Sequence, residues 1–125
     1  MRYGGTMDII KETSSVANKI IALRKEFHKH PELAMKEYET SKRIKAELDK
    51  LGIPYEESIN KEVIATIGKG DGKVVALRAD MDALRIKENT GVRYASENEG
   101  IMHACGHDAH MASLLGAAMV LKKYE

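Results

Sequence analysis

The residues best suited to chemistry concentrate between positions 101 and 115. This stretch holds three of the chain's five histidines, His103, His107 and His110, and its only cysteine, Cys105. Thiolate and imidazole groups are strong ligands for divalent transition metals, and zinc in particular. Their density here predicts metal chemistry.

Cys105 and His107 are the predicted metal ligands. On an extended backbone, residues two apart point to the same side, about 6 to 7 Å apart, and can converge on one ion with bonds of about 2.0 to 2.3 Å. A competing arrangement places His103, His107 and His110 on one helix face as a three-histidine site. Gly106 argues against an uninterrupted helix. His103 and His110 therefore rank behind His107, as residues that orient a ligand or face solvent.

Asp80 and Asp82 form an acidic pair upstream, within residues 77–84 (LRADMDAL). Alternate residues of a strand face the same way, so both carboxylates would lie on one side. Close carboxylates need a cation between them, or one must hold a proton. The two aspartates are therefore candidate catalytic residues that complete or orient a metal site or act in acid–base chemistry. In the alternative interpretation, one caps the following turn and the other pairs with Arg78.

Cysteine can also act as a nucleophile when a histidine activates it. That chemistry needs a base within hydrogen-bond reach and an oxyanion hole, and the sequence shows neither. A cysteine-nucleophile hydrolase is therefore the lesser alternative. His28 and His30 lie near the end of a predicted helix, where a cation interacts favourably with the helix dipole, and are interpreted as structural.

Two amphipathic helices are predicted in the first half of the chain. Apolar residues recur at helical spacing over residues 9–29, with Asp8 as the predicted cap, and Pro31 ends the pattern. The second helix is predicted over residues 36–51, with Gly52 in a left-handed cap. A third helix is predicted over residues 109–123.

The third predicted helix would begin directly after the metal-ligand candidates. Asp108 is its predicted N-cap, and Gly116 within it is expected to permit close packing on a sheet. Two β-branched runs, residues 63–67 and 74–77, predict a hairpin around a glycine-rich turn. The second run is continuously apolar, which predicts a central strand that delivers the acidic pair to its carboxyl end, where open α/β sheets bind ligands.

Composition excludes several classes of protein. A length of 125 residues suits one domain, and 20 Lys+Arg against 19 Asp+Glu give no single-sign field for nucleic acid or an anionic membrane. No apolar run approaches the ~18 residues of a membrane span. A single cysteine forms no internal disulfide, which predicts a reducing, cytoplasmic location. Residues 1–7 carry no periodic pattern and are predicted to be a loose leader.

Three segments, in this order, resemble the M20 metallopeptidase superfamily: residues 24–33 (RKEFHKHPEL) with Glu37 and Thr40, residues 77–84, and residues 102–110 (MHACGHDAH). The sequence is most similar to the amidohydrolase branch, which contains hippurate hydrolases, N-acyl-amino-acid amidohydrolases and auxin-conjugate hydrolases. Arg85 departs from the pattern, because these proteins commonly have proline after Ala-Leu. This departure affects a loop beside the site and not a ligand.

The resemblance implies a zinc-peptidase-like α/β catalytic domain, a mixed sheet flanked by helices, of which residues 8–125 are the N-terminal portion. It implies two divalent metal ions, zinc or manganese, with Cys105 as a bridging ligand and His107 as a terminal one. The segment with Asp80 and Asp82 matches the aspartate motif that orients the site, without deciding between them. A glutamate pair, two further histidines and a lid or dimerisation domain would lie beyond residue 125.

The function implied by the resemblance is metal-dependent hydrolysis of the amide bond of N-acyl amino acids or related conjugates, with the 125-residue chain inactive alone. The expected partners are a small peptide-like substrate and a second copy of the chain, with neither nucleic acid nor membrane. The alternative is a non-catalytic, truncated module that oligomerises through an exposed sheet edge and apolar faces.

Overall fold

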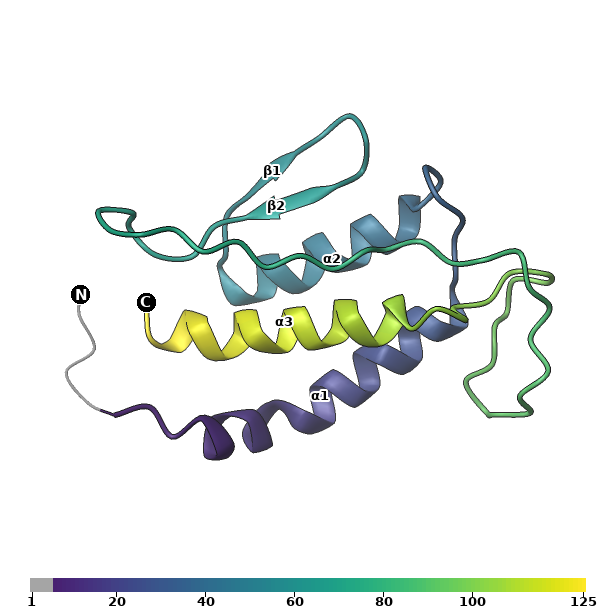
Figure 1. The fold of residues 1–125 in the computed structure, drawn as a ribbon, viewed down its shortest axis with the longest axis horizontal. Coiled ribbons are helices and arrows are strands. Elements are labelled where there is room, and N and C mark those ends of the chain that lie inside the picture. Colours follow the sequence, from purple (N-terminus) through teal and green to yellow (C-terminus); the bar gives the residue numbers. More distant parts are fainter. Residues whose placement is uncertain (1–5) are drawn as a thin grey trace.

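The computed structural model describes residues 6–125 (Figure 1). Its elements are, in order, α1 (Ile9–Lys29), α2 (Tyr38–Leu51), β1 (Tyr55–Glu57), β2 (Val63–Ala65) and α3 (His107–Lys123). Three helices and a small antiparallel sheet confirm the mixed α/β class. None of the helices in this described part is long and apolar enough to cross a membrane. The predicted leader lies outside the described residues, except for positions 6 and 7, which have no regular structure.

Helix α1 begins and ends where local chemistry predicts. The Asp8 carboxylate accepts a hydrogen bond from the Lys11 backbone N–H at 3.1 Å, which satisfies one of the free donors at the helix start. The helix stops at Lys29, two residues before Pro31, which cannot donate a backbone hydrogen bond. Both predicted boundaries are therefore confirmed.

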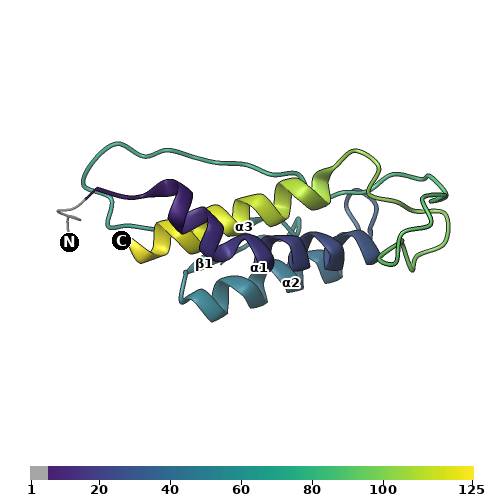
Figure 2. The ribbon, with the colours of Figure 1, turned by 90° about the horizontal axis from the view of Figure 1, so that it is seen from below.

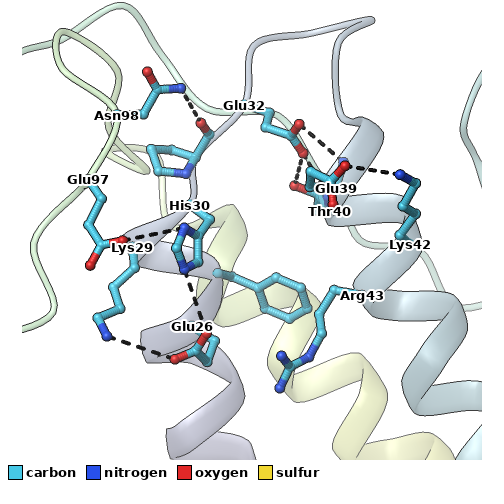
Figure 3. Close-up of a pocket in the computed structure, with 12 residues that line it drawn as sticks. Glu26, Lys29, His30, Glu32, Glu39, Thr40, Lys42, Arg43, Glu97 and Asn98 are labelled. Atoms are coloured by element: carbon cyan, nitrogen blue, oxygen red, sulfur yellow. Dashed lines mark hydrogen bonds and ion pairs between the residues drawn. The ribbon is translucent and has the colours of Figure 1, made fainter.

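Helix α2 is capped from outside. Its N-cap residue, Glu37, makes no side-chain cap bond, and the carboxylate of Glu32 instead accepts from the backbone N–H groups of Glu39 at 3.2 Å and Thr40 at 2.6 Å (Figure 3). A carboxylate at this end also interacts favourably with the helix dipole. The helix ends at Gly52, whose φ of 68° is the predicted left-handed cap.

Helix α3 lies between α1 and α2 in the view of Figure 1, and the view from below shows it running alongside α1 (Figures 1 and 2). Its buried face contributes Met111, Ala112, Leu115 and Met119 to the apolar core. A Cβ atom at Gly116 would lie 2.3 Å from Ile20 Cδ1, so the glycine permits close packing, as predicted. The partner is helix α1 and not a sheet, which corrects the expectation.

The predicted cap of α3 is wrong. The N-cap is Gly106, in a left-handed conformation with φ 85°, and it makes no side-chain cap bond. Asp108 lies inside the first turn, fully buried, and its carboxylate points at α1. Charged donors on α1 therefore draw this side chain away from the helix end.

The predicted hairpin is also wrong. Strand β2 pairs antiparallel with β1, in the register Tyr55↔Ala65 and Glu56↔Ile64. A short connection closes this pair at little entropic cost, and Lys61 adopts a positive φ of 68° in its turn. Residues 74–77 belong to a drawn-out segment without a strand partner in the described chain (Figure 1), and Val74 and Val75 are 86% and 81% exposed. This segment is therefore not a covered central strand here.

The segment 83–106 is fastened to the end of α1. Ala83 forms a parallel bridge with Leu33, and Leu84 an antiparallel bridge with Met102. The Glu97 backbone N–H also donates to the Lys29 carbonyl at 2.8 Å. The end of α1, the start of α3 and this segment consequently meet at one end of the molecule (Figure 1).

Candidate metal centre

His107 is held by Asp82 in one defined tautomer. Its ring Nδ1 lies 2.9 Å from the Asp82 carbonyl oxygen and 3.0 Å from the Asp82 carboxylate Oδ1. Both atoms can only accept, so Nδ1 must carry the proton. The Nε2 lone pair of the neutral ring is then available to a metal, which is the usual arrangement when a carboxylate orients a histidine ligand.

Asp80 approaches the other side of the same ring. Its Oδ2 lies 4.0 Å from His107 Nε2, so the two aspartates address opposite nitrogens of one imidazole. The Arg78 guanidinium donates to Asp80 Oδ1 at 2.9 and 3.1 Å and holds the pKa of Asp80 below its ordinary value. The pairing with Arg78 from the alternative interpretation therefore occurs, and it leaves Asp80 Oδ2 facing the candidate metal position.

Cys105 is exposed and lies two residues before His107. The backbone between them is not extended, because Gly106 turns the chain with φ 85° and ψ 11°. Within residues 6–125 no hydrogen bond joins the Cys105 thiol to a histidine, and no group of three potential ligands forms a metal cluster. A thiol and an imidazole Nε2 are ligand types that suit zinc, and the neighbouring aspartate carboxylates are ligand types that also suit manganese.

The three-histidine arrangement does not form. His103 precedes α3, and only His107 and His110 share its first turn, with ring centroids 6.0 Å apart. His103 is 3% exposed and neither of its ring nitrogens has a partner among the described residues. Burial lowers the pKa of His103, although the Asp108 charge acts in the opposite direction.

A buried ionic network behind the ligands joins α1 to α3, and the sequence interpretation missed it. Asp108 Oδ2 accepts from Arg24 Nε at 2.9 Å and lies 2.7 Å from His28 Nδ1. His28 does lie in the last turn of α1, in the structural role that the sequence predicts, but its buried ring also has a long-range partner in Asp108. The spacing of Arg24 and His28, four residues apart on one helix face, was the only available signal.

Glu88 completes this network from the segment 83–106. Its carboxylate oxygens lie 3.0 and 3.1 Å from His28 Nε2, and it accepts from the Ser96 N–H at 2.9 Å and from the Thr90 hydroxyl. Burial alone would raise the pKa of Glu88, but these hydrogen bonds outweigh it and the pKa is lowered. Both His28 ring nitrogens therefore face carboxylate oxygens, Nδ1 that of Asp108 and Nε2 that of Glu88.

A groove of about 700 Å³ lies apart from the metal-ligand candidates, between the end of α1 and the start of α2 (Figure 3). Neither aspartate of the acidic pair, nor Cys105 or His107, lines it. Its charged rim is paired within itself: His30 lies 3.7 Å from Glu26 and 3.8 Å from Glu97. The side chain of His30 is therefore already paired with carboxylates of the groove itself and is not left free for a charged ligand.

Known proteins resemble this chain in sequence. The family model described as Peptidase family M20/M25/M40 matches residues 76–125. Thermostable carboxypeptidase 1 of Saccharolobus solfataricus is 45% identical in a match 124 residues long, which covers 94% of this chain and 32% of the relative. N-acetyl-L-cysteine deacetylase of Bacillus subtilis is 48% identical over 88% of this chain and 27% of its own length. IAA-amino acid hydrolase ILR1-like 5 of Arabidopsis thaliana is 48% identical over 85% of this chain and 25% of its own length.

A solved structure shares the fold. The Bacillus subtilis YXEP protein, described as a dinuclear metal binding peptidase from the M20 family, superposes with a TM-score of 0.83 at 44% identity, over 88% of this chain and 32% of its own. Fold and sequence together place the chain among relatives of hydrolytic metalloenzymes. Within that class, the matches confirm the resemblance to the M20 family and its amidohydrolases. The chain spans about a third or less of the length of the curated relatives it matches.

Proposed function

We propose that this chain forms one side of the active site of a metal-dependent amidohydrolase that cleaves N-acyl amino acids or related conjugates. The observation that carries the proposal is the double hydrogen bond from His107 Nδ1 to Asp82, which leaves Nε2 free to bind a metal. The names of the relatives, a deacetylase and an amino acid hydrolase, support an amide substrate. The dinuclear neighbour supports two metal ions, which we propose to be zinc or manganese.

In this proposal each residue has a separate role. Cys105 and His107 would hold the metal, which supplies Lewis-acid polarisation of the scissile carbonyl and activation of water when bound. Asp82 keeps the His107 ring in its productive tautomer and orientation. Asp80 is ionised beside His107 Nε2 and adds negative charge that favours a cation there. The general base and the remaining ligands would come from other parts of the enzyme.

A chimera tests this function. The segment of Bacillus subtilis N-acetyl-L-cysteine deacetylase that matches this chain would be replaced by residues 8–125, and hydrolysis of N-acetyl and N-benzoyl amino acids would be measured with and without chelator. We expect activity that chelator abolishes and that Cys105→Ala or His107→Ala lowers by at least about 100-fold. Activity indifferent to chelator or to both substitutions would exclude the proposal. A folded, metal-loaded chimera with no activity would do the same.

A second candidate function, self-association, rests on the exposed apolar segment. Val74, Val75 and Leu77 are exposed on a stretch of chain that has no strand partner within the described residues. Such an unpaired stretch is a template for strand addition. Light scattering of the purified 125-residue chain separates the two candidates: a metal-free oligomer supports the self-associating module, and a monomer that takes up metal supports the active-site fragment.

A further inference from the structure

The start of α3 has no cap of its own. Gly106 is the N-cap residue and offers no side chain to the free N–H groups of the first turn. It also adopts a left-handed conformation with φ 85°, which glycine reaches more readily than other residues. An uncapped first turn frays unless tertiary contacts hold it, and this turn contains His107.

Asp108 supplies the tertiary contact. It follows His107 directly, is fully buried, and receives two charge-assisted hydrogen bonds from α1, from Arg24 at 2.9 Å and from His28 at 2.7 Å. Bonds of this kind are roughly twice as strong as neutral ones. Removing either donor leaves a buried carboxylate short of a partner, which is strongly unfavourable.

The two donors are themselves fixed. Arg24 Nη1 donates to the Tyr94 hydroxyl at 3.0 Å, and its guanidinium lies 5.1 Å from the Tyr94 ring centroid. His28 Nε2 is bound by Glu88. The segment 83–106 therefore binds both donors, Arg24 through Tyr94 and His28 through Glu88. These contacts fix the positions of the two donors independently of their bonds to Asp108.

We infer that Arg24 and His28 are positioning residues for the metal ligand His107, acting through Asp108. Asp82 holds the His107 ring from one side, and the α1 donors hold the backbone of the same helical turn from the other. The inference rests on the metal role proposed for His107. Neither donor touches the metal or the substrate in this arrangement.

The metal-free chain gives a direct test. The tautomer of His107 can be read from two-bond ¹H–¹⁵N spectra of histidine-labelled protein, with His107→Gln to assign the signal. We expect the Nδ1–H form in the wild type and in Glu12→Gln, a control that weakens the α1–α3 contact at its opposite end. Arg24→Met and His28→Gln should mix the two tautomers, and Arg24→Lys should restore the wild-type form in part.

A zinc titration follows the same variants. Cys105 is the only cysteine, so the rate at which it reacts with a thiol reagent reports zinc bound at the site. Zinc protection should weaken by about 10-fold to 100-fold in Arg24→Met and His28→Gln, and should not change in Glu12→Gln.

The zinc titration and the tautomer spectra test different proposals, so a negative result in one does not decide the other. Zinc that never protects Cys105 in the wild type counts against the proposed metal role, while the tautomer still decides the positioning role. An unchanged His107 tautomer in folded Arg24→Met and His28→Gln overturns the inference, as does a wild type without the Nδ1–H form. If the buried His28→Gln does not fold, the half-exposed Arg24 variants decide.

Discussion

At the scale of single residues, the structure separates two aspartates that the sequence left equivalent. Asp82 holds His107 Nδ1, whereas Asp80 is paired with Arg78 and faces the metal side of the ring. A carboxylate that binds the distal nitrogen of a ligand histidine raises its basicity and fixes its orientation. The orienting role therefore falls to Asp82 in our proposal.

Substitution of each aspartate tests this division. Asp82→Asn removes the charge behind His107 and should weaken zinc binding by about 10-fold to 100-fold. Asp80→Asn keeps the orientation of the ring and should weaken it by less than about threefold, because Asp80 is half-exposed and its charge is already paired with Arg78. Competition with a chromophoric zinc indicator measures both. A larger effect at Asp80 than at Asp82 would reverse the assignment.

Sequence alone could predict part of this site and not the rest. The Cys105 and His107 candidates, and the nearby aspartates, were recognisable because metal-ligand types were dense within short segments. The Asp108 network was not recognisable, because His28 and Asp108 are 80 residues apart and each has a plausible local role as a helix-end residue. Only the packing of α1 on α3 shows that both side chains turn towards each other.

At the scale of elements, the α1–α3 contact is fastened at its second end by Glu12. Its carboxylate accepts from Lys123 Nζ at 3.0 Å and from the Tyr124 hydroxyl at 2.8 Å. These hydrogen bonds lower the pKa of Glu12 below its ordinary value of 4.5. Folding therefore favours the ionised carboxylate.

This lowered pKa makes the contact dependent on pH. The stabilisation is fully present above pH 4.5 and is lost as the pH falls through the lower pKa of the folded state. Glu12→Gln should therefore be less stable than the wild type at pH 7, with the difference shrinking towards pH 3. Urea unfolding at the two pH values measures this. A difference that grows on acidification would contradict the assignment.

Gly116 tests the closeness of the two helices. Gly116→Ala should gain up to about 1 kcal/mol in helix propensity but lose about 1 to 3 kcal/mol through its contact with Ile20, for a net destabilisation of about 1 kcal/mol. In an Ile20→Ala background the clash is absent, and the same change should stabilise. Thermal or urea unfolding of the four proteins completes the cycle. Equal effects in both backgrounds would show that Ile20 moves aside freely.

The helices were predictable because their signals are local. Periodic apolar residues, Asp8, Pro31 and Gly52 all act within one or two turns of the position they define. Strand partners depend instead on what else is nearby in space. Strand β1 has the sequence Tyr-Glu-Glu, which lacks an apolar pattern, so the true partner of β2 was overlooked in favour of the apolar run at residues 74–77.

At the scale of the whole molecule, the apolar residues Val74, Val75 and Leu77 of that run are exposed on the surface. Val75→Lys with Leu77→Lys places charge on the surface available for strand addition and should shift the chain towards monomer. The matched control is Val92→Lys, away from this segment. Light scattering across a concentration series measures the change. Unaltered association in the double variant would show that another surface is responsible.

The pairing of α1 with α3 also has a consequence for synthesis on the ribosome. Asp108 is synthesised 80 residues after His28, so the network between them cannot form until that length of chain has been added. At about 5 to 20 residues per second, that delay is about 4 to 16 seconds. During this interval the apolar face of α1 has no packing partner from α3, which makes the first helix the natural contact for a chaperone that binds the nascent chain.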